Sequence, residues 1–129
     1  MQKMKQNAIG WFDIYVNDMD RATNFYQKVF KQTLEVMQDP TDSKVQMKSF
    51  PTDIGIYGAG GALVQREGSK PGGGGTTVYF GVKDCAVEES RVVAAGGQVI
   101  RPKMSVREFG WIALCMDTEG NRFGLSSME

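Results

Sequence analysis

Residues 11–16 alternate between apolar and polar positions, and this period of two predicts a half-buried strand. The apolar face of this strand would consist of Phe12, Ile14 and Val16. Asp18 follows where a helix would begin, and its carboxylate is a favourable N-cap because it accepts a hydrogen bond from a free amide. Apolar residues then recur at the spacing of one helical face: Met19, Ala22, Phe25, Tyr26 and Val29. The stretch therefore predicts a strand, a cap and a helix that ends near Phe30.

The same pattern returns 66 residues later, where Val82-Lys83-Asp84 corresponds to Val16-Asn17-Asp18. A second helix is predicted over residues 85–95, with Gly96 as a left-handed C-cap. The inward-facing residues of this helix would be Val87, Val92 and Ala95. We therefore interpret the chain as two copies of one unit.

Three more strands follow the helix in each unit. They are predicted at residues 33–37, 43–50 and 61–67 in unit one, and at 98–101, 111–117 and 122–126 in unit two. Pro102 would stop the strand before it because proline lacks an amide donor. Alternation would place Trp111 and Cys115 on the same wall as the polar side of the first strand. The predicted organisation is a single domain, residues 1–129, with unit one at about 8–67, a glycine-rich linker at 68–75 and unit two at about 76–127.

Composition excludes several kinds of function. The sequence contains no histidine, which removes the commonest metal ligand and the base of Ser-His and Cys-His nucleophile pairs. Fifteen Lys and Arg residues balance 15 Asp and Glu residues, so nothing favours nucleic acid or an anionic membrane surface. No apolar run reaches the ~18 residues of a membrane helix, and the start lacks a signal-peptide core. With Cys85 and Cys115 expected as reduced thiols, we predict a cytoplasmic protein.

Three motifs carry a resemblance to a known family. They are Val16-x-Asp18-x-x-x-Ala22-x-x-Phe25-Tyr26, then Val82-x-Asp84 with Ala94-Ala95-Gly96-Gly97, and Asp117-Thr118-Glu119-Gly120-Asn121-Arg122-Phe123. A duplicated strand–helix–three-strand unit with these motifs resembles the vicinal oxygen chelate superfamily, which includes glyoxalase I, extradiol dioxygenases and the fosfomycin- and bleomycin-resistance proteins. The chain is most similar to its small bacterial glyoxalase-related branch. The resemblance implies an α+β fold, in which two tandem βαβββ units form a cup-shaped mixed sheet around a small-molecule ligand, and a homodimer.

Metal-dependent members of this superfamily hold their cation on the first and fourth strands of each unit. Carried over to this sequence, the ligand positions fall on Trp11, Thr77 and Gly124, and on Ala62 or Val64. These residues do not form a ligand set for a divalent cation, because indole is donor-only and glycine has no side chain. We therefore predict no metal and no other cofactor.

The residues expected to line the cup are Trp11, Asp13, Tyr15, Thr77, Tyr79, Trp111 and Cys115. The main hypothesis is a glyoxalase/bleomycin-resistance-like protein that binds a small organic molecule in a metal-free cup, with its reaction unassigned. The alternative is a lyase or isomerase that uses Asp13 or a tyrosine such as Tyr79 as acid or base. Structural explanations stay open as well: Trp11 would fill the space of a lost metal, Asp13 would lie at a wet rim, and the Cys115 thiol would be buried and inert.

Overall fold

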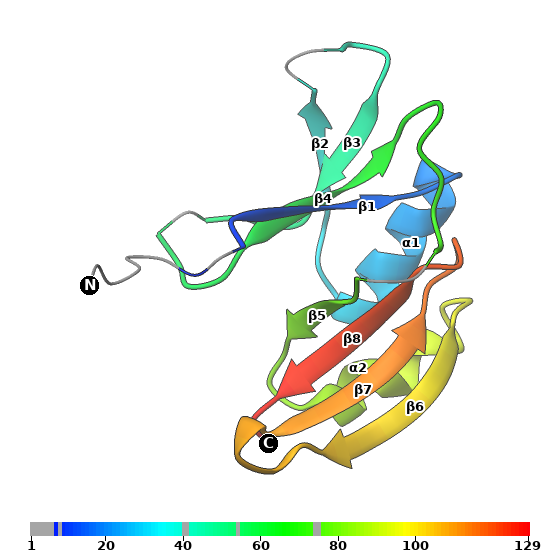
Figure 1. Ribbon diagram of the computed structural model, residues 1–129. Coiled ribbons are helices and arrows are strands. Elements are labelled where there is room, and N and C mark those ends of the chain that lie inside the picture. Colours follow the sequence, from blue (N-terminus) through cyan, green and yellow to red (C-terminus); the bar gives the residue numbers. More distant parts are fainter. Residues whose placement is uncertain (1–6, 8, 40–41, 54, 74–75) are drawn as a thin grey trace.

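The structure, a computed structural model, describes residues 7, 9–39, 42–53, 55–73 and 76–129 (Figure 1). Unit one contains β1 (Trp11–Tyr15), α1 (Met19–Phe30), β2 (Glu35–Gln38), β3 (Gln46–Ser49) and β4 (Gly60–Gln65). Unit two contains β5 (Val78–Gly81), α2 (Cys85–Val92), β6 (Gln98–Ser105), the short 3-10 helix η1 (Arg107–Phe109), β7 (Trp111–Met116) and β8 (Arg122–Ser127). The predicted linker at 68–75 falls partly outside the described residues.

Each unit forms a four-stranded sheet, and the two sheets have the same topology. The strand order is β1-β4-β3-β2 in unit one and β5-β8-β7-β6 in unit two. The first and fourth strands of each unit pair in parallel, whereas the other pairs are antiparallel. This arrangement confirms the predicted α+β fold of two tandem βαβββ units. It also makes β1 and β5 edge strands of their sheets, and this property shapes the candidate site.

The two helices begin at the predicted caps. The Asp18 carboxylate accepts a hydrogen bond from the Arg21 amide at 3.0 Å, and Asp84 accepts one from the Ala86 amide at 3.0 Å. Each bond satisfies an amide that the first helical turn would otherwise leave free. Gly96 has a φ of 104°, which agrees with its predicted left-handed conformation after α2.

One hydrophobic core joins the two units. The helix-facing residues of β1 and β8 pack with α1 and α2, and the α1 residues predicted from periodicity are all buried. Phe25 of α1 contacts Phe123 of β8 with ring centroids 5.8 Å apart, so the helix of unit one packs against the sheet of unit two. A second, smaller cluster lies on the opposite face of sheet one: Val45, Met47, Ala62 and Val64, with Tyr15 and Met37 packed against it.

Two local predictions are wrong. Pro102 does not end its strand, because β6 continues to Ser105 with register shifts on both sides of Arg101. β6 is an edge strand, where a missing amide donor and an irregular register are tolerated. Val87 does not face inward, since 44% of its surface is exposed on α2.

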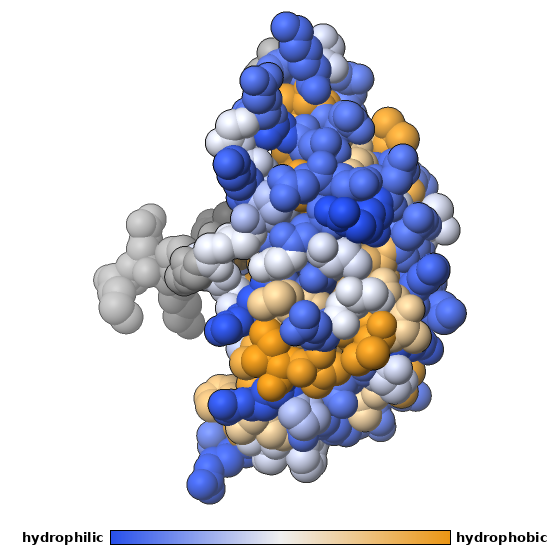
Figure 2. All heavy atoms as spheres, turned by 90° about the vertical axis from the view of Figure 1, so that its right-hand side faces the viewer, coloured by the Kyte–Doolittle hydropathy of each residue, from blue (hydrophilic) through white to orange (hydrophobic). Residues whose placement is uncertain are grey.

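The right-hand side of the molecule in Figure 1 is mostly hydrophilic, and its largest apolar area lies at about the level of α2 (Figure 2). The exposed Val87 and Val93 belong to this helix and its C-cap. Within the described residues, no helix has the length and apolar character needed to cross a bilayer.

Candidate ligand-binding site

A pocket of about 540 Å³ lies between the two units, and we call it the inter-unit pocket. Unit one contributes residues of β1, the start of β4 and the connection between β3 and β4, and unit two contributes all of β5 and one residue of β8. The lining consists of Phe12, Gln32, Phe50, Pro51, Tyr57, Gly58, Ala59, Gly60, Gly61, Val78, Tyr79, Phe80, Gly81 and Ser126. The pocket therefore exists only because the two units pack together.

Aromatic rings from both units form one wall of the pocket. The ring centroids of Phe12 and Phe80 are 5.8 Å apart in an edge-to-face arrangement, and Phe50 lies 5.8 Å from Phe12 and 5.3 Å from Phe80. Phe30 supports Phe80 from behind at 4.7 Å. Such edge-to-face and tilted contacts are favourable geometries for aromatic pairs. Gly61 is required beside them, because a Cβ at this position would overlap the Phe12 ring.

Residues of the β3–β4 connection, residues 50–59, also line the pocket, and we call this connection, which begins with Phe50, the pocket loop. Tyr57 on this loop is 90% exposed although it lines the pocket. Gly58 has a φ of 111°, a conformation that favours glycine. The Thr52 hydroxyl donates to the Phe50 carbonyl at 2.9 Å and fixes the start of the loop.

Seven residues were expected to line the cup. Of these, Tyr79 alone appears among the described residues that line the inter-unit pocket. Its ring covers Gly124, its partner across the β5–β8 pair, so a Cβ at position 124 would overlap the ring. Trp11 and Asp13 lie together on β1, where the indole N–H donates to the Asp13 carboxylate at 2.9 Å. Tyr15 packs on the smaller hydrophobic cluster of sheet one, and Thr77 lies half-buried just before β5.

The expectation that Trp111 and Cys115 face the cup is wrong. Cys115 is fully buried in the core that contains α2, and burial raises the pKa of its thiol to about 11. Trp111 shares that face by alternation, and the Lys103 ammonium lies 5.0 Å from its ring while it donates to Asp84 at 2.9 Å. The alternation in β7 was predicted correctly. The face that carries Ala113 and Cys115 was assigned to the cup, but these small residues pack in the core that contains α2.

The residues at the carried-over ligand positions do not fit a divalent cation. Trp11 offers only a donor, and Tyr79 covers the place of a side chain at Gly124. Across the described ranges, no three His, Cys, Asp or Glu side chains gather as a metal site. No step of a metal-assisted reaction can be assigned to these side chains.

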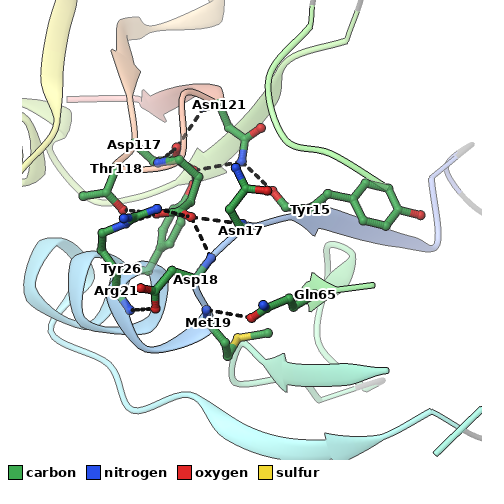
Figure 3. Close-up of polar contacts among 11 residues, drawn as sticks. Tyr15, Asn17, Asp18, Met19, Arg21, Tyr26, Gln65, Asp117, Thr118 and Asn121 are labelled. Carbon is green, nitrogen blue, oxygen red and sulfur yellow. Dashed lines mark hydrogen bonds and ion pairs between the residues drawn. The ribbon is translucent and has the colours of Figure 1, made fainter. Parts of the chain in front are cut away.

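A group of polar contacts near the start of α1 also joins the two units (Figure 3). Residues 117–121, which we call the latch turn, connect β7 and β8 and bring Glu119 against the start of α1. The Glu119 carboxylate accepts hydrogen bonds from the Asn17 and Asp18 amides at 3.0 Å each, and from the Arg21 guanidinium at 2.7 and 2.9 Å. Burial by itself would raise the pKa of Glu119, but hydrogen bonds from Arg21, Thr118 and the two amides lower it to about 2.

Two more residues of the latch turn, the buried Asp117 and the half-buried Asn121, also contact unit one. The Tyr26 hydroxyl donates to the Asp117 carboxylate at 2.7 Å, and the Asn121 side chain donates to the Tyr15 carbonyl at 2.8 Å (Figure 3). Burial, followed by the Asp117 charge, raises the pKa of Tyr26 well above its ordinary value. The motif at residues 117–123 is one of the three that carry the family resemblance. Its first five residues form a contact between the units that is distinct from the inter-unit pocket.

Most residues of the pocket were not predicted as site residues. Phe12 was assigned to the apolar face of its strand, and neither Phe80 nor the pocket loop was named as part of a site. A signal existed in the glycine-rich run from Gly55 to Gly61 around an isolated tyrosine, since exposed loops between rigid strands often carry binding residues.

Comparison with known proteins decides the family. The Glyoxalase/Bleomycin resistance protein/Dioxygenase superfamily matches residues 8–125. The chain belongs to this superfamily. Among solved structures of this fold, glyoxalase I from Zea mays has a TM-score of 0.70 at 21% identity and covers 91% of this chain and 43% of the maize chain. TnmS3, an antibiotic binding protein from Streptomyces sp. CB03234, has a TM-score of 0.66 at 22% identity and covers 97% of this chain and 98% of its own.

Two curated relatives come from Streptomyces. The anthracycline biosynthesis proteins DauV from Streptomyces sp. (strain C5) and DnrV from Streptomyces peucetius are each 28% identical over 135 residues. The alignment covers 97% of this chain but 48% of either relative. The chain therefore spans about half the length of these curated relatives.

Proposed function

We propose that this superfamily member binds a small aromatic organic molecule in the inter-unit pocket without a metal. The observation that carries the proposal is the pocket of about 540 Å³ with an aromatic wall made by both units. Pockets of this volume, lined mainly by apolar and aromatic side chains, accommodate drug-sized ligands. The rings of Phe12, Phe50 and Phe80 would contact a planar ligand, and Tyr57 offers a further ring in the lining.

The names of the relatives support this ligand class. DauV and DnrV are named for anthracycline biosynthesis, and TnmS3 is described as an antibiotic binding protein. Binding alone would need only the lined pocket, which agrees with the poor fit of the carried-over positions to a cation.

The test is to fill the pocket from within. A Cβ at Gly81 would meet no atom within 4 Å, so Gly81→Leu should fold normally and place its side chain in the pocket. Gly10 is equally open but lies outside the lining, which makes Gly10→Leu a matched control. Titration with naphthalene carboxamide and a tetracyclic anthracyclinone, followed by calorimetry, should show binding to wild type and Gly10→Leu. Gly81→Leu should lose at least about tenfold in affinity.

A chelator added to the same titrations should leave the affinities unchanged if no metal takes part. The absence of binding by wild type, or equal binding by Gly81→Leu, would contradict the proposed site.

A second candidate function, an acid–base lyase or isomerase, is favoured by one observation. Tyr79, like Tyr57, lines the pocket, and a tyrosine hydroxyl can act as a weak catalytic acid. Asp13 lies outside the lining and accepts from Trp11. If the protein is an enzyme, Tyr79→Phe should retain the ligand but stop its conversion, which mass spectrometry of the incubated ligand would detect.

The homodimer, the cytoplasmic location and the bacterial origin stay predictions. Sedimentation velocity at micromolar concentration would test the first of them.

A further inference from the structure

The lining of the inter-unit pocket carries no formal charge. Among its described residues there is no Asp, Glu, Lys or Arg, and its side-chain polar groups are those of Gln32, Ser126 and two tyrosines. The carboxylate of Asp53 on the pocket loop is not part of this lining. It lines an adjoining pocket of about 280 Å³, which shares residues such as Tyr57 and Gly58 with the inter-unit pocket, and it accepts a hydrogen bond from the Gly55 amide at 2.8 Å.

Backbone groups add neutral hydrogen-bonding capacity to this pocket. The Val82 amide donates to the Ser126 carbonyl at 2.9 Å, so the backbone groups of Val82 point toward β8. Backbone direction alternates along a strand, and the amides and carbonyls of Tyr79 and Gly81 therefore point away from β8. Because β5 is an edge strand and lines the pocket along its whole length, these four groups lie on its open edge.

The equivalent edge of β1 is partly occupied. The Val16 amide donates to the Val64 carbonyl, so the Tyr15 backbone points to the open edge by the same alternation. The Asn121 side chain binds the Tyr15 carbonyl at 2.8 Å. The latch turn thus caps one open edge, and the edge of β5 faces the pocket.

We infer that the inter-unit pocket selects an uncharged aromatic ligand, whose neutral carbonyl, hydroxyl or amide groups pair with the open edge of β5. This inference rests on the proposed function and names the ligand class of the same site. An ionised ligand would lose hydration in a site that offers no opposite charge, whereas an amide or hydroxyl would exchange water for the backbone of Tyr79 and Gly81.

The experiment compares ligands that share one ring system and differ in charge. Wild-type protein is titrated at neutral pH with naphthalene carboxamide, naphthalene carboxylate, naphthylmethylammonium and ethylnaphthalene. We expect the amide to bind at least about tenfold more tightly than either ion, and about threefold or more tightly than ethylnaphthalene. An ion that binds as tightly as the amide would overturn the selection for uncharged ligands, and an equal affinity for ethylnaphthalene would remove the role of the β5 edge.

A charge placed in the lining tests the physical cause. Gln32→Glu should raise the affinity for naphthylmethylammonium about threefold or more, because it supplies the missing counter-charge. Gln38→Glu adds the same charge on β2, outside the lining, and should leave the affinity unchanged. Equal responses of the two variants would contradict the electrostatic explanation. If none of the four compounds binds wild type, the proposed function itself fails, which is a different result from binding without charge selection.

Discussion

The connection between the third and fourth strands occurs once in each unit, and the two copies have different lengths and contacts. In unit two, the latch turn spans residues 117–121 and buries Asp117 and Glu119 against α1. In unit one, the pocket loop spans residues 50–59, and its described residues beyond Phe50 are exposed. One topological position thus joins the units in one copy and lines a pocket between them in the other.

The difference follows from the residues of each connection. The latch turn has Gly120 with a φ of 81°, and the Asp117 carboxylate accepts from the amides of Glu119 and Asn121 at 2.8 Å. These bonds define a tight turn without outside support. In the described part of the pocket loop, the Asp53 carboxylate accepts from the Gly55 amide, and the Tyr57 side chain is exposed. Duplication therefore supplied two copies of a connection, of which one holds the fold together and the other borders the candidate site.

The largest effect on stability is expected when the contacts of Glu119 in the latch turn are weakened. Glu119→Gln removes the charge that four hydrogen bonds from unit one share, and should lower the free energy of unfolding by about 2–3 kcal/mol. Urea denaturation followed by circular dichroism would measure it. Glu67→Gln, at an exposed position after β4, is the control and should change stability by less than about 0.5 kcal/mol. Equal losses in the two variants would mean that the latch turn does not join the units.

The pH dependence of the free energy of unfolding gives a second test of the Glu119 contacts. Because the pKa of Glu119 is about 2 in the folded protein, against an ordinary value of 4.5, the unfolded chain binds the proton first as the pH falls. The stabilising contribution of the Glu119 carboxylate is therefore complete above about pH 4.5 and is lost as the pH falls toward about 2. Burial raises the pKa of Asp117, which works in the opposite direction.

The stability difference between wild type and Glu119→Gln should thus narrow as the pH falls below about 4.5. Urea titrations at several pH values would show this trend. A difference that stays constant down to about pH 2.5 would contradict the low pKa of Glu119.

The sequence predicted the fold well because the fold depends on local patterns. The period-two strand at 11–16, the caps at Asp18 and Asp84, and the positive φ of Gly96 each follow from a few neighbouring residues. Their repetition in two units then constrained the topology. Where one residue decided the prediction, as at Pro102, the tolerance of an edge strand made it wrong.

The candidate site was harder to predict because it arises from packing between units. Tyr79 was identified by parity, but Phe12 and Phe80 look like core residues until the two sheets are placed side by side. The face of Cys115 could not be decided either, since both sides of β7 carry apolar residues and alternation alone does not say which side meets a helix. The role of Glu119 depends on contacts with residues about one hundred positions away, at Asn17 and Asp18.

The smallest effect on stability is expected in the pocket loop, at Tyr57. Its side chain is 90% exposed, so Tyr57→Ser should change the free energy of unfolding by less than about 0.5 kcal/mol. The same change removes a ring from the pocket lining, and aromatic stacking contributes about 0.5–1.5 kcal/mol, which corresponds to a loss of roughly threefold to tenfold in affinity for naphthalene carboxamide. Phe109 is an equally suitable exposed aromatic, at 73%, but lies in η1 outside the lining. Phe109→Ser should therefore alter neither stability nor affinity, and a similar loss of affinity in both variants would place the ligand away from the pocket loop.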